Sequence, residues 1–196
     1  MSASIHTGAP GVVEPATSNT RVLRNLYFVR FGFAVTWAIL LIATAQSINP
    51  GAIALLVLYP LFDVAAAIID FRSSGSSRPK APLYINIALS LAAAIGLAAV
   101  VGSGIPDVLR VWGVWAITAG IVQLIVASLR WRIGGQLAQI LSGGLSVLAG
   151  AGFFLVAAGP NAALTIVGGY AVLGGIFFLI SAIQLHLVIR KAGKRS

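Results

Sequence analysis

The chain has 196 residues, of which 59% are hydrophobic and 9% are charged, and its mean hydropathy is +0.99. A soluble globule of this length needs more polar side chains to cover its surface, so the composition predicts an integral membrane protein. The net charge of +9 does not indicate nucleic-acid binding, because the basic residues lie at the ends of apolar segments, where they act as topology signals. The absence of cysteine excludes disulfides, thiolate metal sites and cysteine catalysis.

A polar stretch over residues 1–20 comes first and is predicted to be a disordered tail. Six apolar segments follow, and each is near or above the roughly 20 residues that a helix needs to cross a bilayer. They occupy about residues 27–45, 51–71, 82–101, 106–129, 133–158 and 160–189. The predicted fold is therefore an all-α polytopic bundle of six transmembrane helices, with a membrane domain over 21–190 and a basic tail over 191–196.

Alternate connections between these segments are basic. The stretches "RSSGSSRPK" and "RWR" and the tail "RKAGKRS" carry the positive charges, whereas the other connections carry no net charge. Basic loops stay on the cytoplasmic side of a membrane, so both termini are predicted to be cytoplasmic, and the basic loops are expected to contact anionic lipids. Trp112 and Trp115, near the opposite end, are expected in the interfacial aromatic belt.

Proline positions indicate an internal repeat. Pro50, Pro106 and Pro160 lie 56 and 54 residues apart, and each is expected to open an even-numbered helix. The repeating unit would be a helical hairpin, used three times, over about residues 25–71, 82–130 and 133–190. Sliding the sequence by 55 or 56 residues also aligns small residues, which let helix backbones approach closely in lipid. The expected packing positions are Gly113, Gly120, Ser146, Gly150, Gly168 and Gly175. The alternative is that glycine and alanine are simply abundant in membrane helices.

The segments "VWGVWAITAGIVQLIVASLR" and "GGYAVLGGIFFLISAIQLHLVIRK", with "LSGGLSVLAGAGFF" between them, resemble the HdeD-like small bacterial membrane proteins. The likeness covers roughly residues 25–190 and depends on glycines, aromatic residues and loop arginines. It implies six helices in the bacterial inner membrane and an association with acid resistance, but no molecular activity.

Three charged residues lie inside the first hairpin, namely Arg30, Asp63 and Asp70. A charge deep in a span costs about 2.5–3.5 kcal/mol on insertion scales, so these side chains should face inward and pair. The two aspartates are seven positions apart and share one helix face, and Arg30 lies between them in depth. The sister hairpins lack the cluster, because Ala119 and roughly Gly174 match Asp63, and Asn86 and Ser142 match Arg30.

Two interpretations of this candidate intramembrane charge cluster remain open. It is either a structural ion pair that fixes the first helix against the second, or a site at which Asp63 holds or passes a proton, as intramembrane acids do in proton relays. The first interpretation fits a non-enzymatic HdeD-type protein that supports envelope or acid-stress tolerance. The second fits a small transporter or proton-conducting pathway. A polar cavity that reaches Asp63 would favour the second, and a dry interior the first.

The sequence contains no motif for a metallohydrolase, a nucleotide site or an activated nucleophile, and Glu14 is its single glutamate. We therefore expect no enzyme, no metal site and no cofactor. The expected partners are the lipid bilayer and either a second copy of the chain or another membrane protein.

Overall fold

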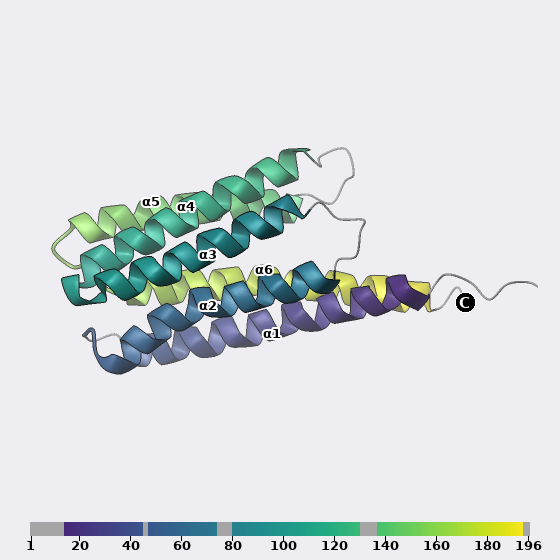
Figure 1. Cartoon of the computed structure of the whole chain (residues 1–196), viewed down its shortest axis with the longest axis horizontal. Coiled ribbons are helices and arrows are strands. Elements are labelled where there is room, and N and C mark those ends of the chain that lie inside the picture. Colours follow the sequence, from purple (N-terminus) through teal and green to yellow (C-terminus); the bar gives the residue numbers. More distant parts are fainter. Residues whose placement is uncertain (1–13, 45–46, 74–79, 130–136, 194–196) are drawn as a thin grey trace, which may run out of the picture.

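The computed structural model describes residues 14–44, 47–73, 80–129 and 137–193, which form a bundle of helices (Figure 1). The helices are α1 (Glu14–Thr44), α2 (Pro50–Ser73), α3 (Ala81–Val100), α4 (Ile105–Leu129), α5 (Leu137–Ala158) and α6 (Thr165–Ala192), with a short 3-10 turn, η1 (Val101–Ser103), after α3. All six α-helices are long and apolar enough to cross a membrane. No strand occurs within these ranges, so the all-α fold and the membrane class are confirmed.

Helix boundaries differ from the expected ones at both ends of the chain. α1 begins at Glu14, so residues 14–20, expected to be disordered, are helical. α6 begins at Thr165 rather than at Pro160, because Pro160 is two residues after the end of α5 and belongs to the turn that reverses the chain. Other expected features lie outside the described residues, namely the tail at 1–13, the connections at 74–79 and 130–136, and the final residues 194–196.

The six helices form a ring in chain order, closed by contact between α1 and α6. The most extensive contacts join α4 to α5, α1 to α6, and α2 to α3, whereas α5 and α6 touch little. The arrangement as three packed hairpins is therefore not confirmed, because the second helix of each sequence hairpin packs mainly on the first helix of the next. The repeat is preserved in another form, since all three major contacts join equivalent pairs of helices.

Glycines explain why two of these contacts are so close. A Cβ atom built on Gly120 would lie 2.6 Å from the carbonyl oxygen of Gly143, and one on Gly113 would lie 3.0 Å from that of Gly150. Backbone therefore meets backbone along the α4–α5 contact. Without a hydrophobic driving force between helices in lipid, such close packing is what holds them together.

The α1–α6 contact repeats this pattern with alanine on one side. A Cβ atom on Gly168 would lie 2.8 Å from the Ile42 side chain, and one on Gly175 would lie 3.2 Å from the Cβ atom of Ala34. The α2–α3 contact lacks these glycines, because valines stand at the matching positions of α2, Val57 and Val64. It is joined instead by polar contacts that belong to the site described below.

The hydrophobic core lies toward one end of the ring, where α1, α3 and α5 finish and α2, α4 and α6 begin. We call this the packed end, and the opposite end the cavity end; in Figure 1 the packed end is at the left. Four rings form its centre, with centroids 4.6 to 6.1 Å apart, and we call them the aromatic plug: Trp37, Tyr59, Trp112 and Trp115.

The expected interfacial position of Trp112 and Trp115 is wrong. Trp112 is 0% exposed and Trp115 is 9% exposed. Helical rotation turns both side chains into the bundle, where the ring contacts with Tyr59 replace contact with lipid headgroups. Their indole nitrogens have no hydrogen-bond partner within the part of the chain that the structure describes.

We predict that Gly120→Ala lowers the thermal stability of the purified protein in detergent. The added methyl group would meet the Gly143 carbonyl, and overpacking of this kind costs about 1–3 kcal/mol. The matched control is Gly144→Ala on α5, where a Cβ atom meets nothing within 4 Å. Equal melting temperatures for the two variants would contradict the close α4–α5 contact.

Candidate functional site: a polar cavity around Arg30 and Asp63

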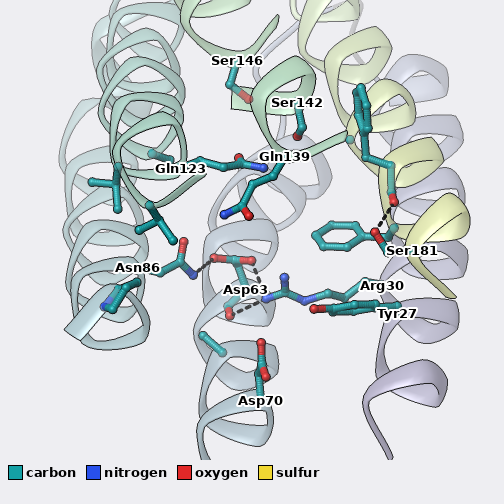
Figure 2. Close-up of a pocket in the computed structure, with 18 of the residues that line it drawn as sticks. Tyr27, Arg30, Asp63, Asp70, Asn86, Gln123, Gln139, Ser142, Ser146 and Ser181 are labelled. Carbon is teal, nitrogen blue, oxygen red and sulfur yellow. Dashed lines mark hydrogen bonds and ion pairs between the residues drawn. The ribbon is translucent and has the colours of Figure 1, made fainter. Parts of the chain in front are cut away.

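A cavity of about 520 Å³ lies inside the ring (Figure 2). It extends from Pro82 and Ala138, the second residues of α3 and α5, to the level of Tyr59, Trp115 and Tyr170. The cavity therefore reaches the cavity end of the bundle, and Tyr59 and Trp115 of the aromatic plug form part of its inner limit. Asp63 is ten residues before the last residue of α2, a depth of about 15 Å along the helix.

Equivalent positions of the three sequence repeats line the cavity wall. Four sets of matching residues line it, with one member from each repeat: Arg30, Asn86 and Ser142; Asp63, Ala119 and Gly174; Tyr59, Trp115 and Tyr170; Asp70, Val126 and Ser181. Among the described lining residues, only the first repeat places charge on this wall. The other repeats place uncharged side chains there.

Asp63 is the centre of the polar contacts. Its Oδ1 atom accepts a hydrogen bond from Arg30 Nη2 at 2.8 Å, which is also the ion pair of the site. Its Oδ2 atom accepts from Asn86 Nδ2 at 2.8 Å and from Ser90 Oγ at 2.7 Å. The Arg30 and Asp63 side chains are 12% and 18% exposed. One carboxylate thus joins α1, α2 and α3, and it replaces the glycine contacts that the α2–α3 pair lacks.

Arg30 uses only part of its hydrogen-bonding capacity. Nη2 bonds Asp63 through Oδ1 and, at 3.4 Å, through the backbone oxygen. The buried Nε has no partner within the described ranges. The guanidinium carbon lies 4.7 Å from the centre of the Phe178 ring, so α6 covers one face of the group. Figure 2 shows the second terminal nitrogen turned away from Asp63, toward the interior of the cavity.

Proline shapes α2 just before Asp63. Pro60 has no backbone N–H, so the Leu56 carbonyl loses its usual helical donor. The neighbouring Leu55 carbonyl accepts a hydrogen bond from Trp37 Nε1 at 2.7 Å. This bond ties α1 to α2 at the aromatic plug, about two turns beyond the ion pair.

The sequence-predicted charged residues are partly brought together. Arg30 and Asp63 form the ion pair, and Asp70 lines the same cavity nearer the helix ends. Of the packing positions, the five glycines lie at the α4–α5 and α1–α6 contacts, and Ser146 forms a 3.0 Å hydrogen bond with the Tyr170 hydroxyl of α6.

Sequence reasoning missed the roles of Asn86 and Ser90 as donors to Asp63. The signal was present, because the two polar residues are four apart on one face of an otherwise apolar helix. It also missed Gln123 and Gln139, which Figure 2 shows extending into the space above Asp63. Within the described ranges, no group of three or more His, Asp or Glu side chains could hold a metal ion.

We predict that Arg30→Leu destabilises the protein by about 3–5 kcal/mol, because it leaves the Asp63 carboxylate buried without its counter-charge. Adding Asp63→Asn should restore most of the loss, whereas adding Asp70→Asn should not, because the ion pair is with Asp63. Thermal unfolding in detergent measures all four proteins, wild type included. Equal recovery in the two double variants would contradict this assignment of the pair.

Comparisons with protein-family models, with curated proteins and with solved structures find no match to this chain. The six apolar helices identify the chain as an integral membrane protein, and the contacts around Arg30 and Asp63 indicate what its cavity can bind.

Proposed function

We propose that the chain is a small transporter that binds a polar solute in its central cavity. The single observation that carries the proposal is the cavity of about 520 Å³ that reaches the Arg30–Asp63 pair. Its volume lies in the range of small-molecule sites, which is about 300–1,000 Å³. A bundle with only a structural role would be expected to fill this space with apolar side chains, since every buried polar group that lacks a partner is costly.

Solute would enter at the cavity end and meet the Arg30–Asp63 pair near the middle of the bilayer. The aromatic plug closes the opposite side, so release there requires a second state in which the plug opens. The limited contact between α5 and α6 makes that boundary the natural place for the ring to change shape. Neighbouring boundaries are bridged more fully, and α1 and α2 are joined by the ion pair itself.

Within this proposal, Asp63 holds Arg30 in place rather than carrying a proton. Both carboxylate oxygens already accept hydrogen bonds, and the three donors come from two other helices. These three donors fix the carboxylate between α1 and α3. We therefore favour solute transport over proton conduction, and we treat Asp63 as a positioning residue.

The proposed location is the bacterial inner membrane, with both termini and the mouth of the cavity on the cytoplasmic side. Loop charge supports this orientation, because Arg24, Arg72, Lys80, Arg190 and Lys191 all lie toward the cavity end.

We predict that Gly174→Phe blocks passage of solute while leaving the fold intact. Gly174 lines the cavity at the position that matches Asp63, and a Cβ atom there meets nothing within 4 Å, so a ring can enter the cavity without a backbone clash. Swelling of proteoliposomes in urea, glycerol and acetate measures the passage. Wild type should exceed protein-free liposomes for at least one solute, and Gly174→Phe should return to the protein-free rate.

The matched control is Gly169→Phe on the same helix. Its Cβ atom also meets nothing within 4 Å, but Gly169 is exposed on the outside of the ring and does not line the cavity. This variant should keep the wild-type rate. Identical rates for wild type, Gly174→Phe and protein-free liposomes would contradict the proposed function.

A second candidate is an HdeD-like protein that supports acid-stress tolerance through its packing or a partner. It is favoured by one observation: Gly143 and Gly150 in "LSGGLSVLAGAGFF", a segment that carries the resemblance, form the α4–α5 backbone contact. Survival of a deletion strain at low pH tests it. Rescue by Gly174→Phe, which blocks the cavity, would favour this candidate over transport.

A further inference from the structure

We propose that the solute carries a small oxyanion, a carboxylate or a phosphate group, and that Arg30 is the residue that binds it. This inference rests on the proposed function and names the chemical class of its solute. It follows from which hydrogen-bonding groups of the site are already used and which are left.

The unused groups around the ion pair are donors. An arginine has five N–H donors, and the two on Nη2 account for every hydrogen bond that Arg30 makes within the described ranges. The N–H on Nε and the two on Nη1 are left. Asp63 differs, because both its oxygens already accept from Arg30, Asn86 and Ser90. A solute at this site therefore meets hydrogen-bond donors, and it must bring acceptors.

Geometry gives these donors a direction. Phe178 covers one face of the guanidinium group, and Asp63 holds the edge that carries Nη2. Nε is buried, so the two N–H groups of Nη1 are the donors that face the cavity interior, on the side where Gln139 extends (Figure 2). The oxygens of a carboxylate or phosphate accept charge-assisted bonds from such groups, and these bonds are stronger than bonds to neutral acceptors.

The charges around the mouth of the cavity favour the entry of an anion. Described basic side chains surround the cavity end, at Arg21, Arg24, Arg72, Lys80, Arg190 and Lys191. The preference of basic residues for the cytoplasmic side of a membrane accounts for their presence. Their positive charge acts on solutes whatever the reason for their position. A mouth with an excess of positive charge concentrates anions. Asp70 lines the cavity on the last turns of α2, two residues before Arg72. Its single negative charge is smaller than the total positive charge of these basic side chains.

Two routes lead an oxyanion to Arg30. One is the mouth at the helix ends, which the cavity reaches at Pro82 and Ala138. The other is the boundary between α5 and α6 near the cavity end, where the two helices touch little and the short residues Ser142 and Gly174 stand in place of the Arg30 and Asp63 of the first repeat. The α5–α6 contacts through Tyr170 lie nearer the packed end. A lipid headgroup could enter by this second route, and it presents the same phosphate chemistry.

The test compares three probes of one shape in protein held in phosphatidylcholine nanodiscs: benzoate, benzamide and benzamidine. Binding is measured by isothermal titration calorimetry. Benzoate should bind at least about tenfold more tightly than benzamidine, with benzamide weaker than benzoate, because only benzoate forms charge-assisted bonds with Arg30. Arg30→Gln together with Asp63→Asn, which leaves no charge stranded, should remove the preference for benzoate.

Two further variants make the result specific. Arg30→Lys keeps the charge but lacks a guanidinium group that can bond Asp63 through one nitrogen and a solute through another in fixed directions, so it should retain only part of the preference. Arg110→Gln removes an arginine whose ion pair with Asp107 is exposed at the packed end, and it should bind benzoate like wild type. Tighter binding of benzamidine, or a benzoate preference that persists in the double variant, would overturn the inference. Binding of benzamide without any preference would overturn it and leave the proposed function standing, whereas no binding of any probe would overturn both.

A final arm separates the two sources of the oxyanion. Short-chain phosphatidylglycerol and short-chain phosphatidylcholine are added in turn as competitors of benzoate. Displacement by phosphatidylglycerol alone would support the inference and identify a lipid headgroup as the occupant. If neither lipid displaces benzoate, the bound benzoate supports a water-soluble anion.

Discussion

Backbone contact between helices is the interaction on which the rest of the structure depends. Apolar helices gain no hydrophobic free energy by leaving lipid for each other. The ring is therefore held by helix surfaces that fit closely, because many small dispersion contacts then add up. Gly113, Gly120, Gly143 and Gly150 supply that fit between α4 and α5, and Gly168 and Gly175 supply it between α6 and α1. With two boundaries fixed in this way, the ring keeps its diameter, and the space at its centre does not need to be filled.

The two ends of the ring differ in the side chains that they present to its centre. At the packed end, rings and aliphatic side chains fill the centre, and the cost of ordering them is offset by extensive burial. At the cavity end, the same helices present polar side chains to the axis. The Arg30–Asp63 pair lies where these regions meet, and the bond from Trp37 to the Leu55 carbonyl ties α1 to α2 on the packed side. A charge pair at this level is partly shielded from lipid by protein and partly reachable from the mouth.

Sequence patterns predict the number and type of the helices well, because 20 apolar residues in a row have few alternatives. They also predict that Arg30 pairs with an aspartate, since an unpaired charge is costly at that depth. They do not choose between Asp63 and Asp70, because that choice depends on helix rotation and on the donors Asn86 and Ser90 of a third helix. The predicted interfacial position of Trp112 is wrong for a related reason. The sequence shows that this tryptophan lies near a helix end, but it does not show which way the side chain faces. The close pairing of α4 with α5 was not predicted either, since the proline repeat grouped α3 with α4 and α5 with α6.

The equivalence of the cavity-lining positions has a consequence for how such a site could arise. Three separate copies of one hairpin, assembled around an axis, would repeat every side chain three times, so an arginine at the position of Arg30 would bring three guanidinium groups into one small space. When the copies are joined in a single chain, a side chain no longer has to be repeated three times. Each copy can then change alone, and here the matching positions hold arginine, asparagine and serine in turn at Arg30, Asn86 and Ser142. Covalent fusion thus permits one off-axis charge in a nearly symmetric ring, and with it a solute that has a head and a tail.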